Sequence, residues 1–141
     1  MTTVAAKAGV FAADTQLSGG GTINRVSKLM RLPDGGVVGG AGTWHQAYQA
    51  MKWMAAGEHG DCPVFEDATL MIGKPDGSLW LAEGCMPPYP LLNDASAIGS
   101  GAQAAQAGML SGKSALQSVE DVIGVDRGTS GPVETMKVRR K

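Results

Sequence analysis

Apolar residues recur at helical spacing in three stretches of the chain. The first stretch follows Thr43, a suitable N-cap, runs to Gly57, and repeats apolar residues on one face at Trp44, Ala47, Tyr48 and Met51. The second stretch opens at Ser100 or Gly101, and the third opens at Ser114. We therefore predict three amphipathic helices, two of which follow one another late in the chain.

Short stretches of small and β-branched residues separate these helices and predict strands. Residues 2–8 and 10–15 flank Gly9 and predict an N-terminal hairpin, and residues 19–21 are expected to be a flexible glycine connection. Further strands are expected at 22–32, 37–41, 68–72, 78–82, 133–138 and a short one ending at Ile98, whereas 86–90 is expected to be irregular. Blocks of strands and helices in this order favour an α+β fold, with helices layered on antiparallel sheets in one domain spanning residues 1–141.

Composition and charge exclude several classes of function. The formal net charge is −1, so the chain has no basic field for nucleic acid, and no apolar run approaches the roughly 18 residues of a membrane span. No signal peptide is recognisable, and a cytoplasmic protein is expected. Cys62 and Cys85 lack the spacing of a zinc or redox site, and His45 and His59 lack partners at metal-ligand spacing. We expect neither a metal nor a cofactor.

The N-terminus offers a catalytic hypothesis. Removal of Met1 would leave Thr2 with its hydroxyl and a free α-amine on the same residue. The hydroxyl can attack a carbonyl, and the amine, whose ordinary pKa is about 7.7–8.0, can take its proton directly or through one water. Because many proteins begin with Met-Thr-Thr, this hypothesis depends on the rest of the chain.

Several segments in collinear order resemble proteasome β subunits and the bacterial HslV peptidase. Residues 2–14 resemble the first hairpin of that family, and residues 26–32 resemble the strand that carries its catalytic lysine. Val38-Gly39-Gly40-Ala41-Gly42 resembles the glycine-rich strand end before the first helix. Ile98-Gly99-Ser100-Gly101 and Asp126-Arg127-Gly128-Thr129-Ser130-Gly131 resemble two later motifs.

The resemblance implies a fold and a set of site residues. The fold would be the four-layer αββα sandwich of the N-terminal-nucleophile (Ntn) hydrolases, in which two antiparallel sheets are flanked by helices. Thr2 would be the nucleophile, Asp14 would hold Lys28 beside it, and a backbone N–H among Gly40, Ala41 and Gly42 would form the oxyanion hole. The amine and a bridging water would be oriented by Ser100, Asp126 and Thr129.

Each of these residues also has a structural interpretation. Lys28 fits a solvated strand face, and Asp14 fits the cap of a turn. Ser100 fits a helix N-cap, and Asp126 with Thr129 fits an Asx-type turn. The glycines also fit close packing of a helix against a strand.

The activity implied by the resemblance is a threonine peptidase that hydrolyses polypeptides inside a homo-oligomeric ring, with an ATPase unfoldase as a candidate partner. An Ntn amidase or acylase acting on a small amide, and a catalytically inactive structural protein of the same fold, stay open. The chain departs from the family after the first helix, where only Gly57–Asp67 stands in place of a second long helix. That departure bears on ring assembly and on any ATPase docking surface.

Overall fold

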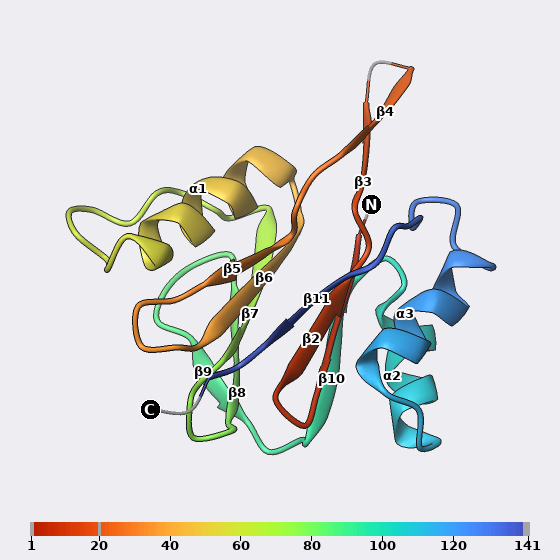
Figure 1. Cartoon of the computed structure of the whole chain (residues 1–141). Coiled ribbons are helices and arrows are strands. Elements are labelled where there is room, and N and C mark those ends of the chain that lie inside the picture. The colour runs from red at the N-terminus through yellow and green to blue at the C-terminus, as the bar shows by residue number, and fades with distance from the viewer. Residues whose placement is uncertain (1, 20, 140–141) are drawn as a thin grey trace.

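Two antiparallel sheets pack face to face in the computed structural model, which describes residues 2–19 and 21–139 (Figure 1). The first sheet has the strand order β10-β1-β2-β11, from β1 (Thr3–Lys7), β2 (Val10–Ala13), β10 (Ala95–Gly99) and β11 (Glu134–Lys137). The second has the order β5-β6-β7-β8-β9, from β5 (Leu29–Arg31), β6 (Val37–Gly42), β7 (Ala68–Gly73), β8 (Leu79–Glu83) and β9 (Tyr89–Leu91).

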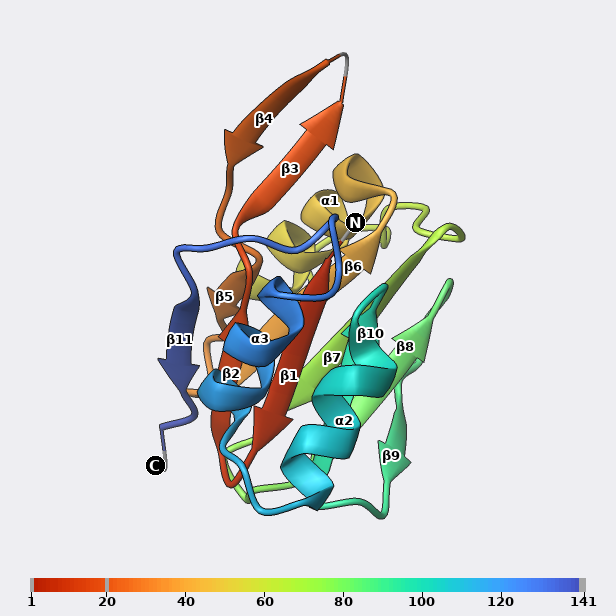
Figure 2. The ribbon, with the colours of Figure 1, turned by 90° about the vertical axis from the view of Figure 1, so that its right-hand side faces the viewer.

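Helices cover the outer face of each sheet. Helix α1 (Trp44–Ala55) lies on the five-stranded sheet, and α2 (Ala102–Leu110) and α3 (Ala115–Ile123) lie on the four-stranded sheet (Figure 2). Helix α3 begins with a capping box, in which Ser114 accepts from the backbone of Gln117 and Gln117 accepts from the backbone of Ser114. The predicted four-layer αββα sandwich is confirmed.

Three apolar cores separate the four layers. Successive residues of β1 serve different cores, because Val4 and Ala6 face the space between the sheets whereas Ala5 faces α2 and α3. The same alternation divides Val37 from Val38 in β6. Both faces of the central strands are therefore buried, which explains why these strands are short apolar runs without polar alternation.

A hairpin outside the sandwich was not predicted. Strands β3 (Gln16–Gly19) and β4 (Thr22–Arg25) form a separate two-stranded sheet that projects from one end of the molecule (Figure 1). Residues 16–19 contain a single large apolar residue, Leu17, and so show no apolar alternation, which is why no strand was expected there. The expected glycine connection falls partly on Gly20, outside the described residues.

The predicted extended segment 22–32 is instead two strands, β4 and β5, separated by residues 26–28. The break lies where Lys28 turns into the interior. Strand β9 was also missed, because Pro90 and its neighbouring prolines favoured an irregular segment. Pro90 is accommodated because β9 is the edge strand of its sheet. In the described part of the chain, no helix is long and apolar enough to cross a membrane.

Candidate active site

Thr2 lies immediately before β1, in a pocket that residues of both sheets line. Val4, two residues later, faces the inter-sheet core, so strand alternation directs the Thr2 side chain to the same side. A Cβ on Gly39 of β6 would lie 2.7 Å from Val4, so these strands approach closely. Further along the same strand, Ala41 and Gly42 line one pocket together with Thr2.

Asp14 and Lys28 form an ion pair in the interior behind the start of β1. Their side chains are 0% and 1% exposed, and Lys28 Nζ lies 2.9 Å from Asp14 Oδ1. The same carboxylate oxygen accepts the Thr3 N–H at 3.0 Å, and Oδ2 accepts the Gln16 N–H at 3.2 Å. Asp14 thus ties the lysine to the main chain immediately after Thr2.

Burial sets the proton affinity of Lys28. Desolvation lowers the pKa of its ammonium below the usual value of 10.5, and the hydrogen bond and charge of Asp14 oppose that shift. Asp14 supports the charged form, but burial outweighs it. Two further charges act in opposite directions, because Arg25 lowers this pKa and Asp126 raises it.

Ser100, Asp126 and Thr129 meet on the other side of the first residues of the chain. Ser100 donates to Asp126 Oδ2 at 2.6 Å, and Thr129 donates to the same oxygen at 2.7 Å. The Thr129 hydroxyl also lies 2.8 Å from the Thr3 hydroxyl. Since the Thr129 proton is directed to Asp126, the Thr3 hydroxyl donates to Thr129 in this arrangement.

These hydrogen bonds stabilise the charged form of Asp126. The Ser100 hydroxyl, followed by the Thr129 hydroxyl, lowers the pKa of the Asp126 carboxyl below its usual 3.8, against a smaller opposing effect of burial. The carboxylate is therefore a fixed negative charge close to the main chain of Thr2, whose carbonyl lies 3.4 Å from the Ser100 hydroxyl.

The three candidate oxyanion donors differ in what surrounds them. The Gly40 N–H already donates to the Lys28 carbonyl at 3.3 Å, and a Cβ on Gly40 would lie 2.6 Å from the Met51 sulfur of α1. Close packing of helix on strand explains that glycine. Neighbouring N–H groups of a strand point to opposite edges, so the Gly42 N–H shares the edge of Gly40 and the Ala41 N–H faces β7. The Gly42 N–H is therefore the remaining donor candidate of the three.

A pocket of about 470 Å³ opens at this point. It is bounded by Thr2, Ala41, Gly42, Thr43, Gly99 and Ser100, and is completed by Asp67, which precedes β7, and by Thr69 of β7. Gly99 approaches the N-terminal segment so closely that a Cβ there would lie 1.9 Å from the Thr2 carbonyl oxygen.

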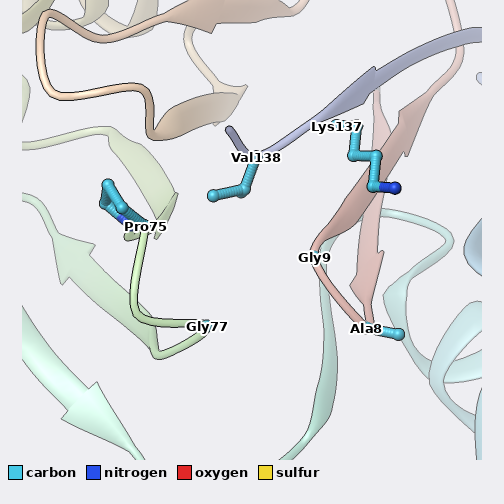
Figure 3. Close-up of a pocket in the computed structure, with 6 residues that line it drawn as sticks. All are labelled: Ala8, Gly9, Pro75, Gly77, Lys137 and Val138. Carbon is cyan, nitrogen blue, oxygen red and sulfur yellow. The ribbon is translucent and has the colours of Figure 1, made fainter. Parts of the chain in front are cut away.

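A second cavity of about 600 Å³ lies at the opposite end of β1, where the β1–β2 and β7–β8 turns meet β11 (Figure 3). Lys137 is the only ionisable side chain among its described lining residues, which are otherwise Ala8, Gly9, Pro75, Gly77 and Val138. This cavity holds none of the candidate catalytic residues. Among the described residues, no three His, Cys, Asp or Glu side chains gather as a metal site would require.

Five further residues at the site were not predicted from the sequence: Thr3, Gln16 and the pocket residues Thr43, Asp67 and Thr69. Thr3 is fully buried and contacts both Asp14 and Thr129, so it joins the two polar groups. Gln16 accepts from the Ser130 hydroxyl at 2.5 Å and so fixes the loop that carries Thr129. Only the repeated threonine at positions 2 and 3 was a visible signal.

No protein-family model matches the sequence, and no curated protein matches it. Solved structures do match. Thiobacillus denitrificans BPH in complex with epoxomicin gives a TM-score of 0.66 at 16% identity, over 97% of this chain and 98% of that chain. BPH without that compound gives 0.65 at 16% identity, over 99% of each chain. Eukaryotic HslV from Trypanosoma brucei gives 0.66 at 19% identity, over 96% of this chain and 98% of that chain.

The chain has the HslV fold. At these identities the likeness concerns the fold alone. It agrees with the layer order that the three cores define, although residues 57–67, all of them described, contain no helix. The HslV fold of this chain therefore has α1 as the single described helix on the five-stranded sheet.

Proposed function

We propose that this protein is an Ntn hydrolase of the threonine peptidase type, with Thr2 as the nucleophile once the residue before it has been removed. The observation that carries the proposal is the buried Lys28–Asp14 pair, whose shared carboxylate oxygen holds the Thr3 N–H. The cost of removing two charges from water offsets most of their attraction, so a buried ion pair without a catalytic use would add little to the stability of the core. Next to a nucleophile, a lysine ammonium lowers the pKa of the hydroxyl and of the α-amine.

The proposed reaction begins with attack of the Thr2 Oγ1 on the substrate carbonyl carbon. The hydroxyl proton passes to the Thr2 α-amine, directly or through one water, and the tetrahedral oxyanion accepts the Gly42 N–H. The ammonium then gives this proton to the departing amine as the amide C–N bond breaks. Water, deprotonated by the same amine, hydrolyses the resulting ester and frees Thr2.

Ser100, Asp126 and Thr129 have an orienting role in this proposal. Their hydrogen bonds end on one carboxylate oxygen, and the Ser100 hydroxyl lies 3.4 Å from the Thr2 carbonyl. A fixed carboxylate beside the freed amine stabilises the ammonium form that the first proton transfer creates.

The likeness to HslV and BPH supports a polypeptide as substrate and a homo-oligomeric ring as the working form. An ATPase unfoldase belongs to the same proposal, as the partner that would supply unfolded chains. Two alternatives compete with this proposal: the protein hydrolyses a small amide, or it has no catalytic activity.

The deciding experiment is the intact mass of the purified protein, with and without a peptide epoxyketone. This reagent is chosen because one of the similar structures is a complex with epoxomicin. We expect a chain that begins at Thr2 and gains one reagent mass. Thr2→Ala abolishes the adduct, Lys28→Ala slows it at least about a hundredfold, and Thr135→Ala, an exposed threonine on β11, leaves it unchanged.

A chain that retains methionine and forms no adduct would refute the proposal. An adduct without peptide hydrolysis, together with turnover of small amides, would favour the amidase. Native mass spectrometry of the same sample reports the number of subunits.

A further inference from the structure

The pocket beside Thr2 has one ionisable side chain among its described lining residues, Asp67. Asp67 is exposed, lies just before β7 and lines the pocket together with Gly99 of the other sheet and with Ser100. The pocket volume of about 470 Å³ falls within the roughly 300–1,000 Å³ of sites that accept small ligands. A substrate group entering this pocket therefore meets a negative charge.

The main chain of Asp67 is fixed against the proposed oxyanion donor. Its N–H donates to Gln46 Oε1 at 2.8 Å, and its carbonyl accepts the Thr43 N–H at 2.9 Å. A Cβ on Gly42 would lie 2.5 Å from the Asp67 carbonyl oxygen. The main chain that carries the Asp67 side chain is therefore held by hydrogen bonds at both its N–H and its carbonyl, directly beside Gly42.

The Asp67 carboxylate differs from the two other acids of the site. Asp14 is paired with Lys28, and Asp126 accepts from Ser100 and Thr129. For Asp67, the described residues supply no hydrogen bond or ion pair to the carboxylate. Its acceptor capacity is free for a ligand, and the nearby hydroxyls of Thr43 and Thr69 offer further polar contacts without a competing charge.

We propose that Asp67 is a specificity-determining residue, which selects peptides with a cationic side chain, arginine or lysine, adjacent to the bond cleaved at Thr2. This inference rests on the proposed function and names its substrate class. A guanidinium can donate two parallel N–H bonds to a carboxylate, whereas an acidic side chain there would face like-charge repulsion. The preference comes from this one carboxylate, since no other described lining side chain is ionisable.

The test uses internally quenched peptides that differ only by arginine or citrulline, which have the same shape but not the same charge. The residue is placed immediately before or immediately after a single cleavable bond, and mass spectrometry identifies the bond cut. The measured quantity is the ratio of kcat/KM for the arginine peptide to that for the citrulline peptide, for the intact protein and its variants. Glu66→Gln removes a neighbouring exposed charge that does not line the pocket, and serves as the matched control.

We expect a ratio of about ten or more for the unmodified protein and for Glu66→Gln. The ratio falls to near one in Asp67→Asn and below one in Asp67→Lys. Turnover that depends on Thr2 but shows the same ratio in Asp67→Asn would overturn the specificity role and leave the proposed function standing.

Absence of Thr2-dependent turnover with every peptide would overturn the proposed function. Binding of a cation in the pocket that Asp67 lines is then measured separately, by titrating the protein with benzamidine and following the amide NMR signals of Thr69 and Gly99. Shifts that saturate in the unmodified protein and disappear in Asp67→Asn support a cation site at Asp67, and an unchanged titration rejects it.

Discussion

The buried Lys28–Asp14 pair makes a strong prediction about stability. Asp14→Asn keeps the shape of the side chain but removes the negative charge that lies 2.9 Å from the buried Lys28 ammonium. Asp14 Oδ1 accepts from Lys28 and Thr3, and Oδ2 accepts from Gln16. An asparagine has only one acceptor oxygen, so its NH₂ group must face at least one of these donors.

The magnitude follows from burial. Breaking a buried ion pair by removing one partner costs about 3–5 kcal/mol, and both side chains here are at most 1% exposed. The other ion pair in the described residues, Lys113–Asp121, is a matched contrast because its side chains are 51% and 56% exposed. Asp121→Asn should cost less than about 1 kcal/mol, as surface pairs do.

Urea denaturation followed by circular dichroism measures both variants. We expect the free energy of unfolding to fall by about 3 kcal/mol or more for Asp14→Asn, a large part of the roughly 5–15 kcal/mol of a typical domain. Asp14→Asn should also lose epoxyketone labelling, whereas Asp121→Asn should retain it. Equal small losses of stability in the two variants would refute the reasoning, because Lys28 would then have another counter-ion or be neutral.

Three other substitutions test separate parts of the structure. Gly42→Ala should slow labelling and lower the free energy of unfolding by about 1–3 kcal/mol, since its φ is 99° and the new Cβ would lie 2.5 Å from the Asp67 carbonyl oxygen; an unchanged free energy of unfolding would contradict this clash, whereas the backbone N–H is kept by alanine. Ser100→Ala should raise the pKa of Asp126 toward 3.8 in an NMR titration of the carboxyl carbon. A carboxyl whose pKa is lowered by folding stabilises the folded protein at pH values above the unfolded pKa, and this stabilisation is lost as the pH falls through the folded pKa. The Ser100→Ala variant has less of this stabilisation to lose, so its free energy of unfolding should fall less on acidification below pH 3.8. Ser118→Ala should leave the free energy of unfolding unchanged or raise it by about 1 kcal/mol in urea denaturation, because the buried Ser118 hydroxyl has no hydrogen-bond partner among the described residues; a clear loss would reveal a partner.

Local patterns predicted the elements that are apolar along their length. The strands at residues 3–7, 10–13 and 37–42 were found because they are buried along almost their whole length, and the helix after Thr43 was found because its apolar residues recur at helical spacing. The hairpin of β3 and β4 was not predicted, because its strands are mostly exposed and therefore need no apolar face. Strand β9 was not predicted, because proline in a sequence indicates an irregular segment, although a strand at a sheet edge tolerates it.

The site residues could be predicted only from the order of the segments that resemble the HslV family, and not from local patterns. Asp14 and Lys28 lie 14 residues apart, and Thr3 and Thr129 lie 126 residues apart, so no local pattern brings these pairs together. Their proximity comes from the sandwich itself. Asp67 gave no signal, because an acidic residue in a polar loop before a strand is ordinary until the fold brings it beside Thr2.

The consecutive threonines at the start of the chain show why the register of β1 matters for the proposed chemistry. Thr3 pairs with Gly99, its N–H bonds to Asp14 and its hydroxyl bonds to Thr129. Successive side chains of a strand point to opposite faces, so the Thr2 hydroxyl points toward the space between the sheets while Thr3 is occupied on the other face. A slip of one residue would exchange the two faces. It would also turn Val4 out of the inter-sheet core, where it packs against Gly39. The apolar packing of Val4 thus fixes the register of β1, and with it which threonine directs its hydroxyl toward the space between the sheets. The hydrogen bonds of Thr3 stabilise the same register.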